Sequence, residues 1–209
     1  MTRRPARPRR LTAKSTRWPT RASNRNVEVC ILTGGMSTRM GCDKSKLRLG
    51  GRSMLEIIAA VARSADLPTR VIRRDCVRRC GPLGGVLTAL KTSCAKAVLF
   101  LACDMPFITA DLLQYLMRFV RGNRALFVRT GNGVGFPLLL PKSAESLVEE
   151  QIERGELSLQ KLAGSLKARI IRVPANWLPQ LTNINTSAEY RWARTRFGAR
   201  LVPSRSRPV

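Results

Sequence analysis

The stretch VEVCILTGGMSTRMGCDKSKL, residues 27–47, determines how the rest of the chain is interpreted. It opens with the apolar run Val29–Leu32, which predicts a short buried strand. A glycine-rich turn follows, and then come the charged residues Arg39 and Lys44. Glycine lets a backbone approach an anion and turn its N–H groups toward it, and a following helix adds partial positive charge. The stretch therefore predicts a phosphate-binding turn between a strand and a helix.

This turn lacks the spacing G-x-x-x-x-G-K-[ST], so the sequence gives no support to a P-loop kinase or ATPase. The simpler alternative is a glycine-rich turn with a solvated basic face. The later motifs favour the phosphate-binding interpretation because they follow in the order that such a site needs.

The charge of the chain is high and unevenly distributed. Its 209 residues carry a formal net charge of +25, from 38 bases and 13 acids. Nine bases lie in residues 1–26 and six in residues 191–209, and neither stretch contains an acid. Since no nucleic-acid-binding motif accompanies this charge, we do not expect nucleic acid as a partner. No apolar run is long enough to cross a membrane, so we expect no membrane association.

The residue types that are missing limit the chemistry. The chain has no histidine, which excludes Ser-His and Cys-His nucleophiles and histidine-ligated metals. Its six cysteines form no C-x-x-C pair. We expect free thiols and a cytoplasmic location.

The hydrophobic pattern predicts one folded domain between two extensions. Residues 1–26 are too polar to fold alone, although a basic arm for a polyanion and a transit peptide stay open as alternatives. Residues 27–196 alternate strands with helices, which predicts an α/β domain, and residues 197–209 are a basic tail expected to be disordered. Strands are predicted at 27–33, 69–72, 97–102, 125–128, 136–140 and 168–173, and helices at 53–64, within 81–90, and at 112–120, 143–153, 158–166 and 188–196.

Three later segments carry candidate site residues. The segment GPLGG, residues 81–85, again lets a backbone approach a ligand, or is only a Pro-Gly turn before a core helix. Asp104 follows the apolar run Ala97–Ala102, at the strand end where open α/β sheets bind ligands. Its carboxylate suits Mg²⁺, and Thr109 and Asp111 are better placed to cap the next helix. In the turn TNINT, residues 182–186, an amide oxygen of Asn185 is a suitable second magnesium ligand, or the turn only caps a helix.

The opening stretch, residues 27–47, resembles the nucleotidyltransferase signature L-[AT]-G-G-x-S-x-R-M-G-x-D-K. The matching positions are Leu32, Gly34, Gly35, Ser37, Arg39, Met40, Gly41, Asp43 and Lys44. With GPLGG, the segment CDMPF at 103–107 and the closing NINT, the chain is most similar to the molybdenum cofactor guanylyltransferases over about residues 27–193. The resemblance implies a Rossmann-like three-layer sandwich with a mostly parallel central sheet.

The resemblance also implies a reaction and a set of site residues. GMP would pass from GTP to the phosphate of molybdopterin, the carrier of molybdenum, with Mg²⁺ as cofactor and pyrophosphate as second product. Transient contacts with proteins that donate or accept the cofactor are implied as well. Catalysis is assigned to Lys44, Arg39 and Asp104, and the metal to Asp104 and Asn185. Nucleotide binding is assigned to Leu32, Thr33, Gly34, Gly35, Lys44, Asp75, Gly81, Pro82, Leu83, Gly84, Gly85 and Asp104.

Two departures from the family keep alternatives open. The segment Pro68–Cys80 is short, and it lacks the family's further strand and nucleotide-binding asparagine. Ser187 stands where the family usually has proline. A related nucleotidyltransferase with CTP or another phosphate acceptor, and a degenerate non-catalytic homologue, are therefore the alternatives.

Overall fold

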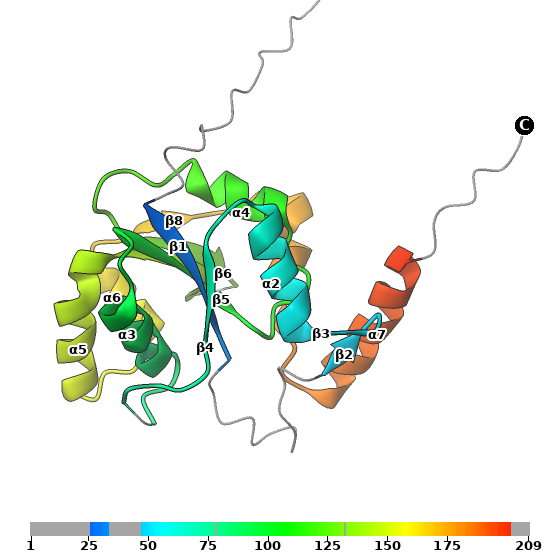
Figure 1. The fold of residues 1–209 in the computed structure, drawn as a ribbon, viewed down its shortest axis with the longest axis horizontal. Helices are drawn as coiled ribbons and strands as arrows, with labels where there is room; N and C mark the ends of the chain where they lie inside the picture. The colour runs from blue at the N-terminus through cyan, green and yellow to red at the C-terminus, as the bar shows by residue number, and fades with distance from the viewer. Residues whose placement is uncertain (1–25, 34–46, 78, 132, 202–209) are drawn as a thin grey trace, which may run out of the picture.

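The computed structural model describes residues 26–33, 47–77, 79–131 and 133–201. In this part of the chain, helices cover both faces of a six-stranded sheet. Helices α3, α5 and α6 lie on one face and α2 and α4 on the other, which gives three layers (Figure 1). The predicted three-layer α/β class is confirmed.

The elements follow the predicted order, with small shifts at their ends. The strands are β1 (Val27–Leu32), β2 (Arg48–Leu49), β3 (Arg52–Ser53), β4 (Thr69–Ile72), β5 (Ala97–Ala102), β6 (Leu126–Thr130), β7 (Gly133–Pro141) and β8 (Arg169–Ile171). The helices are α2 (Met54–Ser64), α3 (Pro82–Thr92), α4 (Ala110–Met117), α5 (Glu145–Glu153), α6 (Leu159–Ser165) and α7 (Ser187–Leu201), with 3-10 helices η2 (Lys142–Ala144) and η3 (Ala175–Leu181).

The sheet is mostly parallel, as expected. Its order is β4-β1-β5-β7-β6-β8, and β7 alone runs opposite to its neighbours. Strands β4, β1 and β5 are parallel, so their carboxyl ends meet at one edge. Strand β4 closes the sheet on that side, because no further strand lies beyond it among the described residues.

Apolar side chains fill both spaces between sheet and helices. The central strand β5 is buried along nearly all of its length, as its uninterrupted apolar run predicts. Its residues point alternately to two cores, with Leu99 facing the α2 and α4 side and Phe100 facing α3 and α5. Burial on both faces fixes the register of β5 and therefore the position of the residues that follow it.

Local capping explains where several helices begin. Ser53 caps α2 with a full capping box, in which its hydroxyl accepts from the Glu56 amide and Glu56 accepts from the Ser53 amide. Thr109, and not Asp104, caps α4 through the amide of Leu112, as predicted. Helix α7 continues to Leu201, beyond the residue 196 at which the sequence predicts its end.

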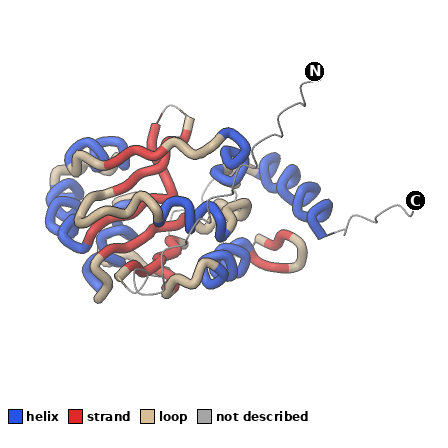
Figure 2. Tube along the Cα trace, turned by 90° about the horizontal axis from the view of Figure 1, so that it is seen from above, coloured by secondary structure: helices blue, strands red, loops and turns tan. Residues whose placement is uncertain are grey.

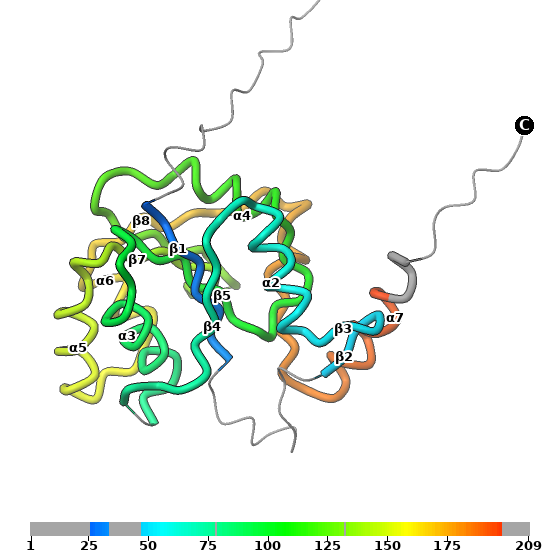
Figure 3. Tube along the Cα trace, in the orientation of Figure 1, coloured from blue at the N-terminus to red at the C-terminus, as the bar shows by residue number. Residues whose placement is uncertain are grey.

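A small antiparallel hairpin of β2 and β3 lies beside α7 at one end of the molecule (Figures 2 and 3). The Tyr190 hydroxyl of α7 donates a hydrogen bond of 2.7 Å to the carbonyl of Arg48. A separate apolar cluster, including Leu49, Met54 and Ile184, packs between the hairpin and the helix. These contacts hold together segments that are far apart in sequence.

Five cysteines in the described ranges are free thiols, as expected, and Cys42 lies outside those ranges. None of the helices that the structure describes is long and apolar enough to span a membrane.

Candidate functional site

The predicted site residues divide into those that the structure describes and those that it does not. Leu32, Thr33, Asp75, the segment Gly81–Gly85, Asp104 and Asn185 are described. Gly34, Gly35, Arg39 and Lys44 lie outside the described residues. The described part of the site consists of strand ends and loops at the carboxyl edge of the sheet.

The ends of three parallel strands are tied together by backbone hydrogen bonds. The Thr33 amide and hydroxyl both donate to the carbonyl of Ile72, at 3.1 and 2.9 Å. The Cys103 amide donates to the carbonyl of Leu32 at 3.1 Å. Thr33 and Asp104 therefore lie just beyond neighbouring strands at the carboxyl edge, where α/β sheets of this kind bind ligands.

Asp104 and the closing turn are joined directly. The Ile184 amide donates a hydrogen bond of 2.8 Å to the carbonyl of Asp104, and Ile184 is fully buried. Asp104 Oδ1 is buried as well. Asn185 is the next residue after Ile184. This hydrogen bond therefore brings the backbone next to Asn185 to Asp104, the other predicted magnesium ligand. A carboxylate and an amide oxygen, with substrate phosphates, form a donor set that suits Mg²⁺.

Glu189 holds this closing turn in place. Its Oε2 accepts from the amides of Asn185 and Thr186 at 2.7 and 2.8 Å, and the Thr186 hydroxyl accepts from the Glu189 amide. This is a capping box at the start of α7. Glu189 is absent from the predicted site residues, although the spacing T-x-x-E at 186–189 is a local pattern that indicates such a box.

The GPLGG segment begins α3 as predicted. Gly81 precedes the helix with a φ of +54°, which side chains other than glycine rarely adopt, and Pro82 occupies the first turn. A Cβ on Gly84 would lie 2.8 Å from the Val77 carbonyl oxygen and 3.1 Å from Asp75 Oδ2. The glycine is therefore required by the close approach of the loop that carries Asp75.

Leu32 lies between the Asp75 loop with α3 on one side and Asp104 on the other. A Cβ on Gly85 would lie 3.2 Å from Leu32 Cδ2 and 3.3 Å from Asp75 Oδ1. The Leu32 side chain thus packs on α3 beside Asp75, while its carbonyl accepts from Cys103 next to Asp104. The structure brings Leu32, Asp75, Gly84 and Gly85 together, and it joins this group to Asp104 through β1.

Asp75 is half-buried, and burial raises the pKa of its carboxyl above the ordinary value. Within the described residues, no hydrogen bond or ion pair to this carboxylate offsets that cost. A partly buried acid that lies beside the first turn of a helix, as Asp75 lies beside Gly84 and Gly85 of α3, is a candidate for binding a polar group of a ligand.

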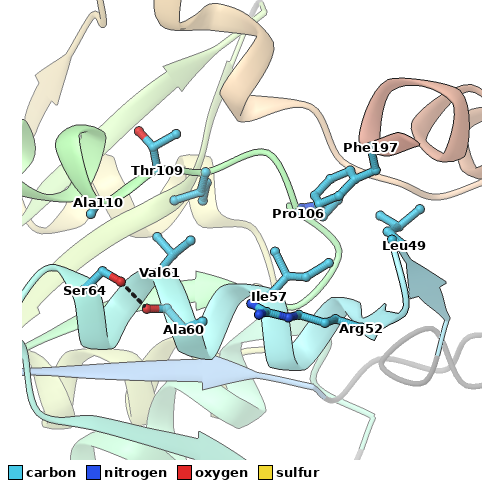
Figure 4. Close-up of a pocket in the computed structure, with 12 residues that line it drawn as sticks. Leu49, Arg52, Ile57, Ala60, Val61, Ser64, Pro106, Thr109, Ala110 and Phe197 are labelled. Atoms are coloured by element: carbon cyan, nitrogen blue, oxygen red, sulfur yellow. Dashed lines mark hydrogen bonds between the residues drawn. The ribbon is translucent and has the colours of Figure 1, made fainter. Parts of the chain in front are cut away.

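A hollow lies beside these elements, between α2 and the loop that follows Asp104. It runs along α2 and faces the segment Pro106–Ala110, as Figure 4 shows. None of the predicted site residues that the structure describes lines it.

Comparison with known proteins agrees with this geometry. The model of the MobA-like NTP transferase domain matches residues 29–170. The chain is 29% identical to a molybdenum cofactor guanylyltransferase of Syntrophotalea carbinolica over 188 residues, which cover 78% of this chain and 89% of the relative. It is 30% identical to a molybdenum cofactor guanylyltransferase of Pseudomonas fluorescens over 178 residues, 76% of this chain and 88% of the relative.

A solved structure with the same fold is the molybdopterin-guanine dinucleotide biosynthesis protein A of Archaeoglobus fulgidus. It superposes with a TM-score of 0.63 at 18% identity, covering 82% of this chain and 99% of the other. From the domain match and the length of the similarity to its relatives, the chain belongs to the MobA-like NTP transferase family.

Proposed function

We propose that this protein is an enzyme that transfers GMP from GTP to the phosphate of molybdopterin and releases pyrophosphate. The family and the names of the relatives support nucleotidyl transfer in molybdenum cofactor biosynthesis. The observation that carries the proposal is the hydrogen bond from Ile184 to Asp104. It brings the acid at the end of β5 and the asparagine turn to one place, as a site for a triphosphate and its metal requires.

The proposed reaction needs no general base. A phosphate oxygen of molybdopterin, already ionised near neutral pH, forms a bond to the α-phosphorus of GTP. The bond from that phosphorus to the oxygen bridging to the β-phosphate breaks, and pyrophosphate leaves with the electron pair. Catalysis then consists of positioning and of charge neutralisation, which a chain without histidine can provide.

The described residues divide this work between two sides of the site. Asp104 and Asn185 would hold Mg²⁺, which neutralises phosphate charge when bound. Leu32, Thr33, Asp75 and the segment Gly81–Gly85 would bind the nucleotide. The sequence adds four residues from the signature stretch to this proposal. Gly34 and Gly35 would bind the nucleotide, and Arg39 and Lys44 would bind its phosphates.

The choice of base is the part most open to alternatives. Strand β4 is the edge of the sheet, and the loop after it leads directly to α3. This arrangement agrees with the short segment in the sequence, where the family's additional strand and asparagine are missing. The second candidate function is therefore that of a related nucleotidyltransferase that uses CTP in place of GTP, or another phosphate acceptor in place of molybdopterin. We also propose a cytoplasmic location and transient contact with proteins that supply or receive the cofactor.

The test measures pyrophosphate release by the full chain with Mg²⁺, molybdopterin and either GTP or CTP. We expect turnover with GTP at a kcat/KM at least about tenfold above that with CTP, a difference of roughly 1.4 kcal/mol. A preference for CTP would support the second candidate. Absence of turnover with both nucleotides, while both bind, would contradict molybdopterin as the acceptor and would favour another phosphate acceptor or a non-catalytic homologue.

A further inference from the structure

A groove of about 520 Å³ runs along the exposed flank of α2. Ile57, Val61 and Ser64 line it from α2 at intervals of about one helical turn, and Pro106 and Ile108 lie opposite. Phe197 of α7 and Arg52 of the hairpin stand at one end, as Figure 4 shows. We call this feature the α2 groove, and its lining is mainly apolar.

The apolar surface continues from the α2 groove onto α7. Phe107 contacts Phe197, with ring centroids 5.4 Å apart, and it contacts Trp192 at 5.3 Å. Trp192 is held by this contact, yet 41% of it remains exposed. A large aromatic side chain that is fixed and still accessible is typical of the residues that dominate binding at protein interfaces.

Exposed arginines lie on the two elements, the hairpin and α7, that flank this apolar surface. Arg48 and Arg52 are exposed on the hairpin, and Arg191, Arg194 and Arg196 are exposed on α7. In the described part of the chain, the three α7 arginines form no ion pairs. The carboxylate of Glu189 accepts from backbone amides at the start of α7, whereas Glu56 lies close enough to Arg48 and Arg52 to interact with their charges. Glu56 offsets part of the hairpin charge, and the positive charge that a partner would meet comes mainly from the three α7 arginines.

We propose that the α2 groove and the arginines beside it form one docking surface for an acidic amphipathic helix of another protein. The apolar face of such a helix would fill the groove, and its carboxylates would meet the arginines. The Arg196 guanidinium lies 5.2 Å from the centroid of the Trp192 ring. An arginine stacked in this way keeps its in-plane N–H groups available for a carboxylate.

Other occupants fit this surface less well. A second copy of the chain carries the same arginines, and two chains of net charge +25 repel each other. Residues 1–26 of the same chain contain nine bases and no acid. A nucleic acid offers phosphates but no apolar side chains for the groove, and Arg196 covers one face of Trp192 against base stacking. An acidic protein segment matches both the charge and the apolar lining, whatever reaction the enzyme performs.

The test uses the full chain and a fluorescein-labelled peptide of about 14 residues, long enough for roughly four helical turns. The peptide has leucine at helical spacing on one face and glutamate elsewhere. Fluorescence anisotropy measures its affinity for the unaltered protein, for Arg191→Ala/Arg194→Ala/Arg196→Ala, and for Ala60→Glu, which places a carboxylate in the groove. The matched control is Arg121→Ala/Arg124→Ala/Arg172→Ala, which removes three exposed arginines from other elements.

We expect both surface variants to bind the peptide at least about tenfold more weakly and the control to change by less than about twofold. Thermal unfolding of each variant shows that the fold is kept, and the two surface variants test charge and groove independently. Equal losses in the surface and control triples would mean that bulk charge binds the peptide, and would overturn the proposal.

Three further outcomes would also overturn it. The first is equal binding of a peptide with the same composition in scrambled order. The second is tighter, variant-sensitive binding of an oligodeoxyuridine of the same length, which would identify a nucleic-acid surface. The third is a dimer in sedimentation experiments that Ala60→Glu abolishes, which would identify a second copy as the occupant.

Discussion

The amide of Ile184 donates a hydrogen bond of 2.8 Å to the carbonyl of Asp104, so the start of the last helix is fixed to the end of the central strand. Both partners are backbone groups. A substitution of the Asp104 side chain therefore leaves this bond in place, and the role of the carboxylate can be tested separately from the fold.

Asp104→Asn keeps the size of the side chain and removes its charge. We expect kcat to fall by at least about 100-fold, because preorganised charge at a reacting phosphate contributes on the order of 3 kcal/mol. Pyrophosphate release measures the loss, and thermal unfolding should show little change in Tm. Asp111→Asn, on an exposed acid in the first turn of α4, is the control and should retain turnover. Full turnover of Asp104→Asn would show that the carboxylate is not a metal ligand.

Glu189→Ala removes the acceptor for two amides in the closing turn. Loss of a helix cap costs about 1 kcal/mol, so we expect Tm to fall by roughly 2–4 °C. Since Asn185 is then no longer positioned, the Mg²⁺ concentration for half-maximal rate should rise several-fold. Glu56→Ala breaks a box of the same type at α2 and should lower Tm to a similar degree without changing the Mg²⁺ requirement. An equal Mg²⁺ effect in both variants would assign Glu189 a purely structural role.

Gly84→Ala adds a Cβ 2.8 Å from the carbonyl oxygen of Val77. The loop that carries Asp75 must move, so we expect a stability loss of about 1–3 kcal/mol and weaker GTP binding in thermal-shift titrations. Gly164→Ala in α6 is the matched control, because its Cβ meets nothing within 4 Å. That substitution should stabilise the protein by about 0.5–1 kcal/mol. A neutral Gly84→Ala variant would contradict the close packing of the loop on α3.

Asp75→Asn should separate stability from binding. Burial raises the pKa of Asp75, so the folded state holds this proton more tightly than the unfolded state. The free energy of unfolding contributed by this group is therefore highest below the unfolded pKa. It decreases as pH rises toward the folded pKa and then stays constant.

The Asn variant has no such decrease. At pH 7 it should be more stable than the unaltered protein in urea unfolding, while the two should converge below about pH 4. If Asp75 binds the nucleotide, the same variant should have a higher Kd for GTP. Lower stability of Asp75→Asn at pH 7 would mean that the carboxylate has a favourable partner in the folded protein.

Local features of the fold were predictable from the sequence, and long-range pairings were not. Thr109 caps α4 as predicted, and Ser53 caps α2 in the same way, because a cap depends on residues three positions away. The opposite direction of β7 is not visible in its apolar run, since strand direction depends on which partner it meets. Helix α7 runs past residue 196, and Phe197 packs on Phe107, a long-range contact that the basic, tail-like composition of the segment does not reveal.

In the candidate site as well, local features were predictable and long-range contacts were not. The position of Asp104 follows from the buried strand before it. The approach of Asp75 to Gly84 and Gly85 joins a loop to a helix turn, and no spacing rule predicts it. Glu189 was detectable as T-x-x-E, but its importance depends on the bond between Ile184 and Asp104, which only the folded chain forms. The signature residues 34–46 remain predictions because they lie outside the described residues.

The bond between Ile184 and Asp104 also has a consequence for synthesis of the protein. All six strands of the sheet precede Ile184 in the chain, so a growing polypeptide contains the whole sheet before the closing turn has been made. Domains fold as units once their sequence is available. If Asn185 and Glu189 complete the metal site, an unfinished or truncated chain would have its framework but could not bind the metal, and activity would begin only with the last helix.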